Sequence, residues 1–254
     1  MLPILNIGPL ALPVSPLALL AGAWLCIYLA ERFAPHFGLN PSKISSLIIL
    51  MLVSGIVSAR IIYIARNYQI FIQHPADIFS RNPGLLDPYG GIALALIIGL
   101  IYSYNKRLPL WRTLDTLAPG LVVLAICIGF ANFASGNAFG KPTDLPWGVY
   151  IWGEYRHPNQ MYLILLFILL FVFIIVRRHT WESGQPGILF LTCAAVGSAI
   201  YLFVEAYRAD SLLFRNTFRT VQLIAWLVLT LSLWGRWKLS TDRNSITSAL
   251  TKKP

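Results

Sequence analysis

Charged residues are scarce in this sequence. They make up 12% of the 254 positions and only ten of them are acidic, whereas hydrophobic residues make up 57% and the mean hydropathy is +0.66. Water-soluble domains carry about 25% charged residues. The composition therefore excludes an ordinary soluble protein and predicts a chain that folds in lipid.

Large polar inserts, internal repeats and metal-ligand spacing are also lacking. No polar segment between apolar runs is long enough to form a soluble domain, so we expect one membrane domain over residues 1–254. The four histidines, His36, His74, His157 and His179, are scattered, and we expect neither a metal site nor a cofactor. Without inverted repeats or interrupted midplane helices, a transporter or channel is the least favoured class.

Cysteine is rare, and its positions argue against disulfides. Cys26, Cys127 and Cys193 all fall inside apolar runs, where a thiol behaves as a small apolar group. The first apolar run has no basic segment before it and no small-residue cleavage site after it. We therefore expect a retained helix there, and no removed signal peptide.

Apolar runs fill most of the chain. A bilayer core calls for roughly 20 apolar residues per helix, and seven runs approach that length with few charges. They predict an all-α integral membrane protein with seven transmembrane helices. The predicted spans are 13–29, 44–65, 90–104, 117–133, 160–176, 188–207 and 221–234, followed by a basic cytoplasmic tail over 235–254.

The distribution of basic residues predicts the orientation of these spans. The net charge is +10, but the basic residues are spread over many loops and form no single stripe for nucleic acid. With the N-terminus outside, twelve would be cytoplasmic: Arg32, Lys43, Lys106, Arg107, Arg112, Arg177, Arg178, Arg236, Lys238, Arg243, Lys252 and Lys253. Seven would lie outside: Arg66, Arg81, Lys141, Arg156, Arg208, Arg215 and Arg219. The positive-inside bias therefore favours N-terminus out and C-terminus in.

Polar residues gather in three loops on the outer side of this topology. They are the segments 82–91, 132–162 and 205–211. An enzyme that handles a phospholipid head group needs such a polar mouth above a groove for acyl chains. The alternative is that every polytopic membrane protein has polar loops, and this feature alone does not separate the two.

Four polar residues lie at or near membrane depth, where an unpaired polar group is costly. Arg60 is inside the second predicted span, Asn132 and Glu205 are near the ends of the fourth and sixth, and Arg208 follows one turn later. One interpretation is an ion pair between Arg60 and Glu205 that ties helices together. The other is an anionic head-group site lined by Arg60 and Arg208.

His157 also allows two interpretations. It precedes Pro158, and a polar residue before proline is typical of a helix start. Histidine can act as a general base near neutral pH. However, no Ser/His/Asp or Cys/His arrangement stands near it in the sequence.

The order of the polar motifs resembles the prolipoprotein diacylglyceryl transferase family. The segments that carry the resemblance are Ile7–Leu10, Ala59–Tyr63, Asp87–Gly91, Gly136–Val149, His157–Tyr162 and Glu205–Asp210. The resemblance covers about residues 5 to 235.

The resemblance implies seven transmembrane helices with the N-terminus outside, in the bacterial inner (plasma) membrane. It implies transfer of the diacylglyceryl group of phosphatidylglycerol to the lipobox cysteine of a prolipoprotein. The partners would be phosphatidylglycerol or a similar anionic phospholipid, the lipobox segment and membrane lipids, with no nucleic acid. Such a reaction needs an acceptor for the thiol proton and cationic stabilisation of the departing phosphate.

This chain departs from the family pattern at several positions. Tyr89 stands where the family has histidine, Gly129 and Tyr201 stand where it has arginine, and Asn137 stands where it has glutamate. Val14-Ser15 replaces an early Trp-Tyr pair. A phenol is mostly protonated near pH 7 and is then a weak base, so loss of the active site is one hypothesis for these substitutions.

Two hypotheses follow from the resemblance. The first is a divergent diacylglyceryl transferase, and the second is a catalytically silent homologue that binds phospholipid or lipoprotein precursors. Under the first, the predicted catalytic residues are Tyr89, Asn132 and Glu205. The predicted substrate-binding residues are Arg60, Asp87, Gly90, Gly91, Gly140, Asp144, His157, Asn159, Gln160 and Arg208.

Overall fold

The computed structural model describes residues 4–7, 10–73, 75–80, 82–182, 184–215 and 217–251. The helices are α1 Val14–Phe33, α2 Pro41–Arg66, α3 Tyr68–Gln73, α4 Pro88–Asn105, α5 Leu110–Ser135, α6 Asn159–Val176, α7 Arg178–Glu182, α8 Ile188–Tyr207 and α9 Thr220–Thr251. Three short 3-10 helices are η1 Ala34–Phe37, η2 Pro75–Phe79 and η3 Pro83–Leu85. Three two-stranded antiparallel hairpins pair β1 Ile4–Ile7 with β2 Leu10–Pro13, β3 Val149–Ile151 with β4 Glu154–Arg156, and β5 Leu213–Phe214 with β6 Phe218–Arg219.

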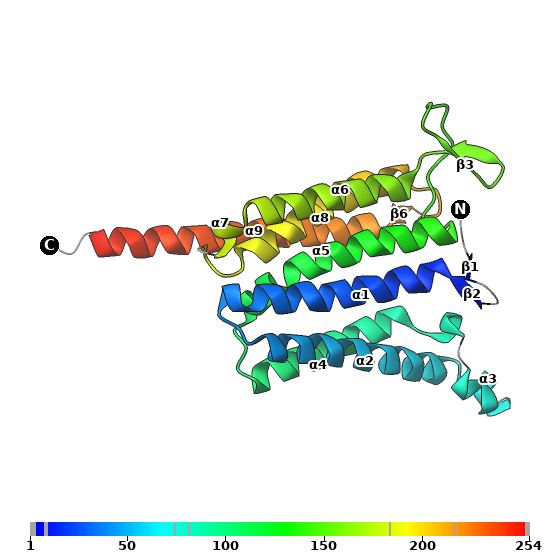
Figure 1. Ribbon diagram of the computed structural model, residues 1–254, viewed down its shortest axis with the longest axis horizontal. Coiled ribbons are helices and arrows are strands. Elements are labelled where there is room, and N and C mark those ends of the chain that lie inside the picture. The colour runs from blue at the N-terminus through cyan, green and yellow to red at the C-terminus, as the bar shows by residue number, and fades with distance from the viewer. Residues whose placement is uncertain are drawn as a thin grey trace.

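The long helices run roughly parallel to one axis and pack in layers (Figure 1). α4 packs on α2, α2 on α1, and α1 on α5. α5 then contacts α6 and α8, and α9 packs on α8. The pair formed by α2 and α4 therefore meets the other long helices chiefly through α1.

Two buried clusters hold these layers together. The larger joins α1, α5, α6 and α8 through residues such as Phe33, Val122, Phe167 and Ile200. The smaller joins α1 to α2 through residues such as Ala30 and Ile44. Both consist of apolar side chains from different helices, so packing in the centre of the bundle positions the helix ends.

The outward faces of the helices are apolar, as expected for lipid contact. Leu165 and Leu169 on α6 are each 57% exposed, and α6 with its 18 residues is about 27 Å long at 1.5 Å per residue. Among the residues that the structure describes, six helices are long and apolar enough to cross a membrane: α1 with η1, α2, α4, α5, α6 and α8. The prediction of an all-α protein with multiple membrane helices is therefore confirmed at this level.

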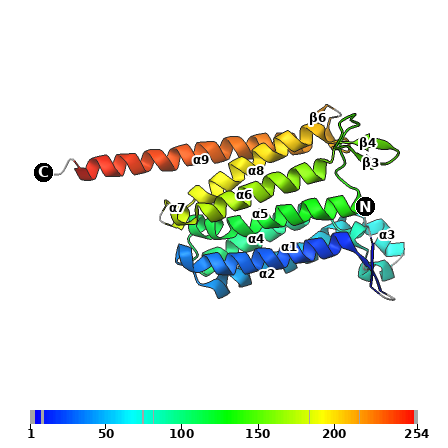
Figure 2. The same ribbon diagram turned by 45° about the horizontal axis from the view of Figure 1, so that its top comes forward.

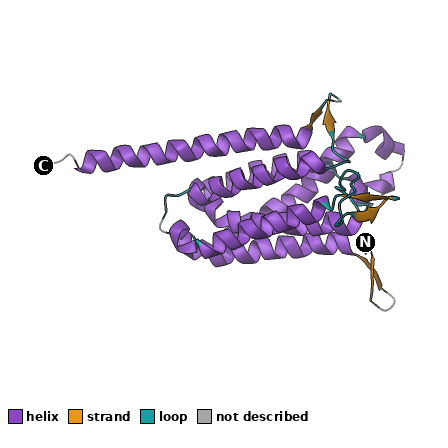
Figure 3. Cartoon of the chain, turned by 90° about the horizontal axis from the view of Figure 1, so that it is seen from above, coloured by secondary structure: helices purple, strands orange, loops and turns teal. Residues whose placement is uncertain are grey.

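α9 is a long helix that is not among the six. Its apolar part contains Gln222, Thr230 and Ser232 and ends before Arg236. The helix continues to Thr251 and extends beyond the rest of the bundle (Figure 3). A seventh span over 221–234 and the orientation of the bundle therefore stay predictions, and so does the extent of the single domain, because residues 1–3 and 252–254 lie outside the described residues.

The hairpins and polar loops gather at one end of the bundle. The loop end is defined here by residues 67–87, 136–158 and 208–219, and β1 and β2 lie at the same end (Figures 1 and 2). η1, α7 and the turn between α4 and α5 lie at the opposite end. The sequence prediction that the polar segments meet at one face agrees with this arrangement.

α5 starts well before its predicted span, and the added turns contain a buried carboxylate. α5 begins at Leu110, seven positions before the predicted span, and includes Asp115. Asp115 is 2% exposed. Its carboxylate accepts two backbone hydrogen bonds, from the N–H of Gly187, the N-cap of α8, at 2.5 Å and from the N–H of Phe190 in α8 at 2.8 Å. Asp115 thus caps the start of α8 from another helix.

Removing this cap should weaken the bundle. Asp115→Ala leaves two buried N–H groups without an acceptor, and we expect a loss of about 1–3 kcal/mol in the free energy of unfolding. Thermal unfolding in detergent measures the effect. Asp115→Asn keeps one acceptor oxygen and should lose less. An unchanged melting temperature for Asp115→Ala would contradict this role.

Candidate functional site

The predicted residues Asp87, Gly90 and Gly91 form the junction between α2 and α4. The Asp87 side chain caps α4 by accepting the Gly90 N–H at 2.8 Å, and its backbone N–H donates to the Ala59 carbonyl at 3.0 Å. Arg66 donates to the other carboxylate oxygen of Asp87. These contacts give Asp87 a structural function at the start of α4.

Glycine at position 91 allows the two helices to approach closely. A Cβ added to Gly91 would lie 2.7 Å from both the Ala59 Cβ and the Gly55 carbonyl oxygen. A Cβ at Gly90 would lie 2.5 Å from the Ile62 side chain. The motif 87–91 is therefore explained by capping and packing before any ligand is considered.

Arg60 organises the loop between α2 and α4. Its guanidinium donates to three backbone carbonyls, those of Asp77 at 2.6 Å, Leu85 at 2.9 Å and Ile78 at 3.1 Å. Of the two interpretations of Arg60, the ion pair with Glu205 is wrong, because Glu205 pairs with Arg208 in another layer of the bundle. Arg60 thus brings a cation to the loop end, in contact with backbone carbonyls.

Tyr89 lies on the first turn of α4 and is 66% exposed. Within the described residues its hydroxyl has no hydrogen-bond partner, and neither a hydrogen bond nor an ion pair joins it to Asn132, Glu205 or Arg208. The predicted residues therefore form two groups, one on α2 and α4 and one on α5, α6 and α8.

The second group is built where the loop after α5 pairs with the end of α8. Gly140 and Arg208 form an antiparallel bridge, flanked by Lys141 N–H to Tyr207 O at 2.8 Å and Ala209 N–H to Phe139 O at 2.9 Å. A Cβ on Gly140 would lie 2.3 Å from the His157 carbonyl oxygen. Only glycine lets the three segments come together at this point.

Arg208 is the cation at the centre of this group. Its Nε donates to Asp210 Oδ1 at 2.7 Å, and its Nη1 lies 3.5 Å from Glu205 Oε2. Burial lowers the pKa of Arg208, but the carboxylates of Asp210 and Glu205 raise it more, so its pKa lies above the ordinary value. The guanidinium is therefore positively charged, and about a quarter of its side chain remains exposed.

Three buried oxygens at the loop end lack a donor within the described residues. Asn159 and Gln160 begin α6, and their amide groups donate to the Ala138 carbonyl at 3.4 Å and the Asn137 carbonyl at 2.6 Å. The side-chain oxygens of both residues, and Oε1 of Glu205, have no partner there. All three residues are 2% exposed, so the site presents acceptors to a hydroxyl, thiol or other donor.

His157 belongs to an aromatic cluster beside these acceptors. Its Nδ1 lies 3.3 Å from the Tyr162 hydroxyl, which accepts the Trp147 Nε1–H at 2.9 Å. The Tyr207 ring centroid is 5.1 Å from that of His157. The predicted helix start is also confirmed, since Pro158 is the N-cap of α6.

Asn132 and Asp144 have fewer contacts. The Asn132 carbonyl accepts N–H groups at the end of α5, from Gly136 and from Asn137 at 3.0 Å. Asp144 is exposed in the loop before β3. Within the described residues no hydrogen bond holds the side chain of either one.

Sequence reasoning missed Asp210 and Tyr162 as site residues. Asp210 both holds Arg208 and accepts the Ala138 N–H at 2.9 Å. In the sequence Arg208 has Glu205 three residues before it and Asp210 two residues after it. This spacing predicts a cation held between two carboxylates. No group of three or more His, Cys, Asp or Glu in the described part of the chain could hold a metal ion.

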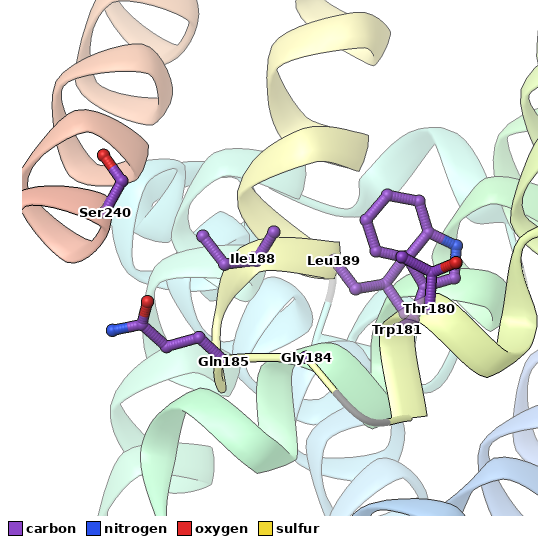
Figure 4. A pocket seen from close by; sticks show the side chains of 7 residues that line it. All are labelled: Thr180, Trp181, Gly184, Gln185, Ile188, Leu189 and Ser240. Atoms are coloured by element: carbon purple, nitrogen blue, oxygen red, sulfur yellow. The ribbon is translucent and has the colours of Figure 1, made fainter. Parts of the chain in front are cut away.

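Two cavities lie at the opposite end of the bundle. One of about 390 Å³ is bounded by Trp181 and Thr180 of α7, by Ile188 of α8 and by Ser240 of α9 (Figure 4). The other, of about 260 Å³, is lined by residues that include His36, Arg112 and Glu182. Neither contains a residue of the predicted site.

The arrangement can bind an anion and accept a proton at the loop end, and the comparison with known proteins agrees with that chemistry. Residues 3–238 match the sequence model of the family described as prolipoprotein diacylglyceryl transferase. The chain belongs to this family. The resemblance predicted from its motifs is therefore confirmed over nearly the whole length.

Individual relatives in the prolipoprotein diacylglyceryl transferase family are distant but cover most of the chain. The three relatives described here are each named phosphatidylglycerol–prolipoprotein diacylglyceryl transferase. The protein of Trichormus variabilis is 29% identical over 246 residues, covering 91% of this chain and 87% of the relative. That of Thermosynechococcus vestitus is 27% identical, covering 92% and 91%, and that of Streptococcus pyogenes serotype M1 is 30% identical, covering 90% and 91%.

Proposed function

We propose that this chain transfers the diacylglyceryl group of phosphatidylglycerol to the cysteine thiol of a prolipoprotein lipobox. The family match supports this reaction. The proposal rests on one observation: Arg208 is held between Glu205 and Asp210. Beside it lie buried side-chain oxygens that accept no hydrogen bond from the described residues. The substrates are a phosphatidylglycerol molecule of the membrane and the lipobox segment of the precursor.

The reaction is a displacement at carbon. The cysteine sulfur attacks the glyceryl carbon bonded to the phosphate oxygen, a C–S bond forms, and the C–O bond breaks. Its electron pair leaves with glycerol phosphate, and the thiol proton passes to an acceptor. Positive charge near the departing phosphate lowers the barrier because negative charge develops there.

In this proposal residues of both groups contact the substrates. Arg208 stabilises the departing phosphate, and the unpartnered Oε1 of Glu205 accepts the thiol proton. Tyr89 and Asn132 complete the catalytic set as hydrogen-bonding groups beside the substrate. Arg60, Asp87, Gly90 and Gly91 shape the α2 and α4 side of the binding site, and Gly140, Asp144, His157, Asn159 and Gln160 shape the other.

Tyr89→Phe tests whether the phenol takes part in the reaction. The Tyr89 side chain is 66% exposed and has no partner among the described residues, so the substitution should leave the fold unchanged. We expect loss of thioether formation with the same melting temperature. Unchanged turnover would assign Tyr89 to packing or lipid contact and remove it from the catalytic set.

The same proposal includes the orientation of the protein in a bacterial plasma membrane. With seven spans, the loop end faces outward and the tail after residue 235 is cytoplasmic, as the excess of basic residues at the opposite end favours. A fluorescent protein fused to the C-terminus should be fluorescent, and alkaline phosphatase fused there should be inactive. The reverse pattern would overturn this orientation.

A specific observation favours a second candidate, a homologue that binds lipid without catalysis. Two positions at which the family has arginine are used here for packing. A Cβ on Gly129 would lie 2.7 Å from the Ile164 side chain, and the ring centroid of Tyr201 lies 5.7 Å from that of Phe167. Purified protein supplied with phosphatidylglycerol and a lipobox peptide separates the two candidates by whether a thioether forms.

A further inference from the structure

The hairpin formed by β3 and β4 carries an exposed aromatic surface outside the site. Tyr150, Trp152 and Tyr155 are 64%, 70% and 61% exposed, and these three side chains are called the aromatic face. Tyr150 and Tyr155 are direct cross-strand partners with ring centroids 5.4 Å apart. Large exposed rings on neighbouring positions are unfavourable in water and indicate a contact surface.

The tip of the hairpin has an unusual residue for its conformation. Trp152 and Gly153 form the two-residue turn, with φ of 55° and 86°. Turns with two positive φ values favour Asn-Gly or Gly-Gly, and a bulky residue at the first position is unfavourable. The turn therefore places an indole at the tip against the local backbone preference.

The opposite side of the hairpin is fixed to the body of the protein. Ile151 is 5% exposed, and the Thr143 N–H donates to the Tyr155 carbonyl at 2.9 Å. Arg156 pairs with Glu154 at 2.8 Å and lies over the Phe139 ring. The hairpin is held in place with its charges neutralised, so no net charge repels the aromatic face from an anionic surface.

The hairpin stands where the lipid-facing surface begins. β4 ends at Arg156 and α6 starts at Asn159, and α6 exposes apolar side chains such as Met161 and Leu165 from its first turns onward. The hairpin projects beyond that end of α6 (Figure 2). The hairpin that carries the aromatic face thus leads directly into a helix with an apolar exposed surface.

We propose that the aromatic face lies in the head-group region of the bilayer leaflet at the loop end. Trp and Tyr have apolar rings with one polar atom, and they concentrate where hydrocarbon meets water. Leucine or isoleucine would suit the hydrocarbon interior or a protein interface equally well. The partner of this surface is therefore the lipid interface itself.

This anchor has a consequence for the site. Pro142 bridges to Arg156 of β4, and the N–H of Lys141, next to Pro142, donates to the carbonyl of Tyr207, which precedes Arg208. Contact of the hairpin with lipid therefore sets the height of the Arg208 segment relative to the membrane surface. The inference concerns lipid contact alone and stands whether or not the chain catalyses transfer.

A spin label at the tip tests the position of the hairpin. Trp152→Cys is labelled in a chain whose three native cysteines are replaced by alanine, in vesicles of phosphatidylglycerol and phosphatidylethanolamine. Leu165→Cys, on the lipid side of α6, and Asp77→Cys, at an exposed position of η2, are the matched controls. We expect the ratio of oxygen to nickel-complex collisions at position 152 to be severalfold above that at 77 and below that at 165.

A collision ratio equal to that at position 77 would overturn the proposal. An immobilised label that neither reagent reaches would also overturn it, because another protein or a second copy of this chain would then cover the aromatic face.

A second measurement keeps the native cysteines. Trp152→Gly suits the positive φ, and it should remove a component of tryptophan emission quenched by lipids brominated near the top of the acyl chain. Removal of a component quenched only by iodide would contradict the anchor.

Discussion

Arg208→Gln is expected to reduce thioether formation by about 10²-fold or more, the typical effect of removing one donor that stabilises developing charge. Arg208 is the cation that the structure clamps at the loop end, with Asp210 at 2.7 Å and Glu205 at 3.5 Å. Glutamine can donate a hydrogen bond but carries no charge, so the departing phosphate loses its counter-charge.

The matched control is Arg215→Gln. Arg215 is an exposed arginine at the same end of the bundle, and its loss should leave turnover within a factor of about two because exposed charges contribute little. Equal effects of the two substitutions would contradict a specific role for Arg208.

Loss of folding is the alternative cause of an inactive Arg208→Gln variant. The substitution leaves Glu205, which is 2% exposed, without its partner, and an unpaired buried charge is strongly destabilising. The double variant Arg208→Gln with Glu205→Gln removes both charges and should recover the melting temperature while remaining inactive. Recovery of activity in the double variant would contradict the proposed catalytic roles of both Arg208 and Glu205.

Gly140→Ala is expected to destabilise the folding of the loop end strongly. The added methyl group would lie 2.3 Å from the His157 carbonyl oxygen and 2.6 Å from the His157 Cβ. The carbonyl oxygen is part of the backbone and the Cβ is bonded directly to it, so neither atom can move away by rotation of a side chain. We expect a loss of at least about 1–3 kcal/mol in the free energy of unfolding, and loss of activity because Gly140 pairs with Arg208.

Gly197→Ala is the control for that experiment. A Cβ at Gly197 of α8 would lie 3.5 Å from the Phe167 ring, an ordinary contact distance. Alanine is favoured over glycine in a helix by about 1 kcal/mol, so its melting temperature should stay level or rise. A Gly140→Ala protein as stable and active as wild type would show that the three segments do not meet as described.

Most of the helices could be predicted from the sequence because long uncharged apolar runs have few alternatives to a membrane helix. The predicted span 188–207 has the same bounds as α8. The start of α5 was missed because Arg112 and Asp115 interrupt the apolar pattern, and Asp115 is a cap for a helix 72 residues away in sequence. The length of α9 was missed because hydropathy does not detect a polar helix.

The site could be predicted only in part. The pairing of Arg208 with Glu205 has helical i, i+3 spacing and is visible in one segment. The bridge between Gly140 and Arg208, and the use of Arg60 to hold loop carbonyls, depend on tertiary contacts that no spacing reveals. The interpretation that Arg60 pairs with Glu205 is wrong because α2 and α8 are in different layers, separated by α1 and α5.

The substituted positions bear directly on activity. Gly129 and Tyr201 now pack against Ile164 and Phe167, so neither position supplies positive charge, and the cations among the predicted site residues are Arg208 and Arg60. The proposed reaction therefore depends on these two cations and on Glu205 as proton acceptor.

The most direct measurement is an assay of the purified full-length protein in phosphatidylglycerol vesicles with a lipobox peptide. Mass spectrometry should detect the peptide with a diacylglyceryl group on its cysteine and an equal amount of released glycerol phosphate, and Arg208→Gln should reduce both by about 10²-fold or more. Intact protein that binds phosphatidylglycerol and yields no thioether would contradict the proposed transfer and leave a lipid-binding homologue.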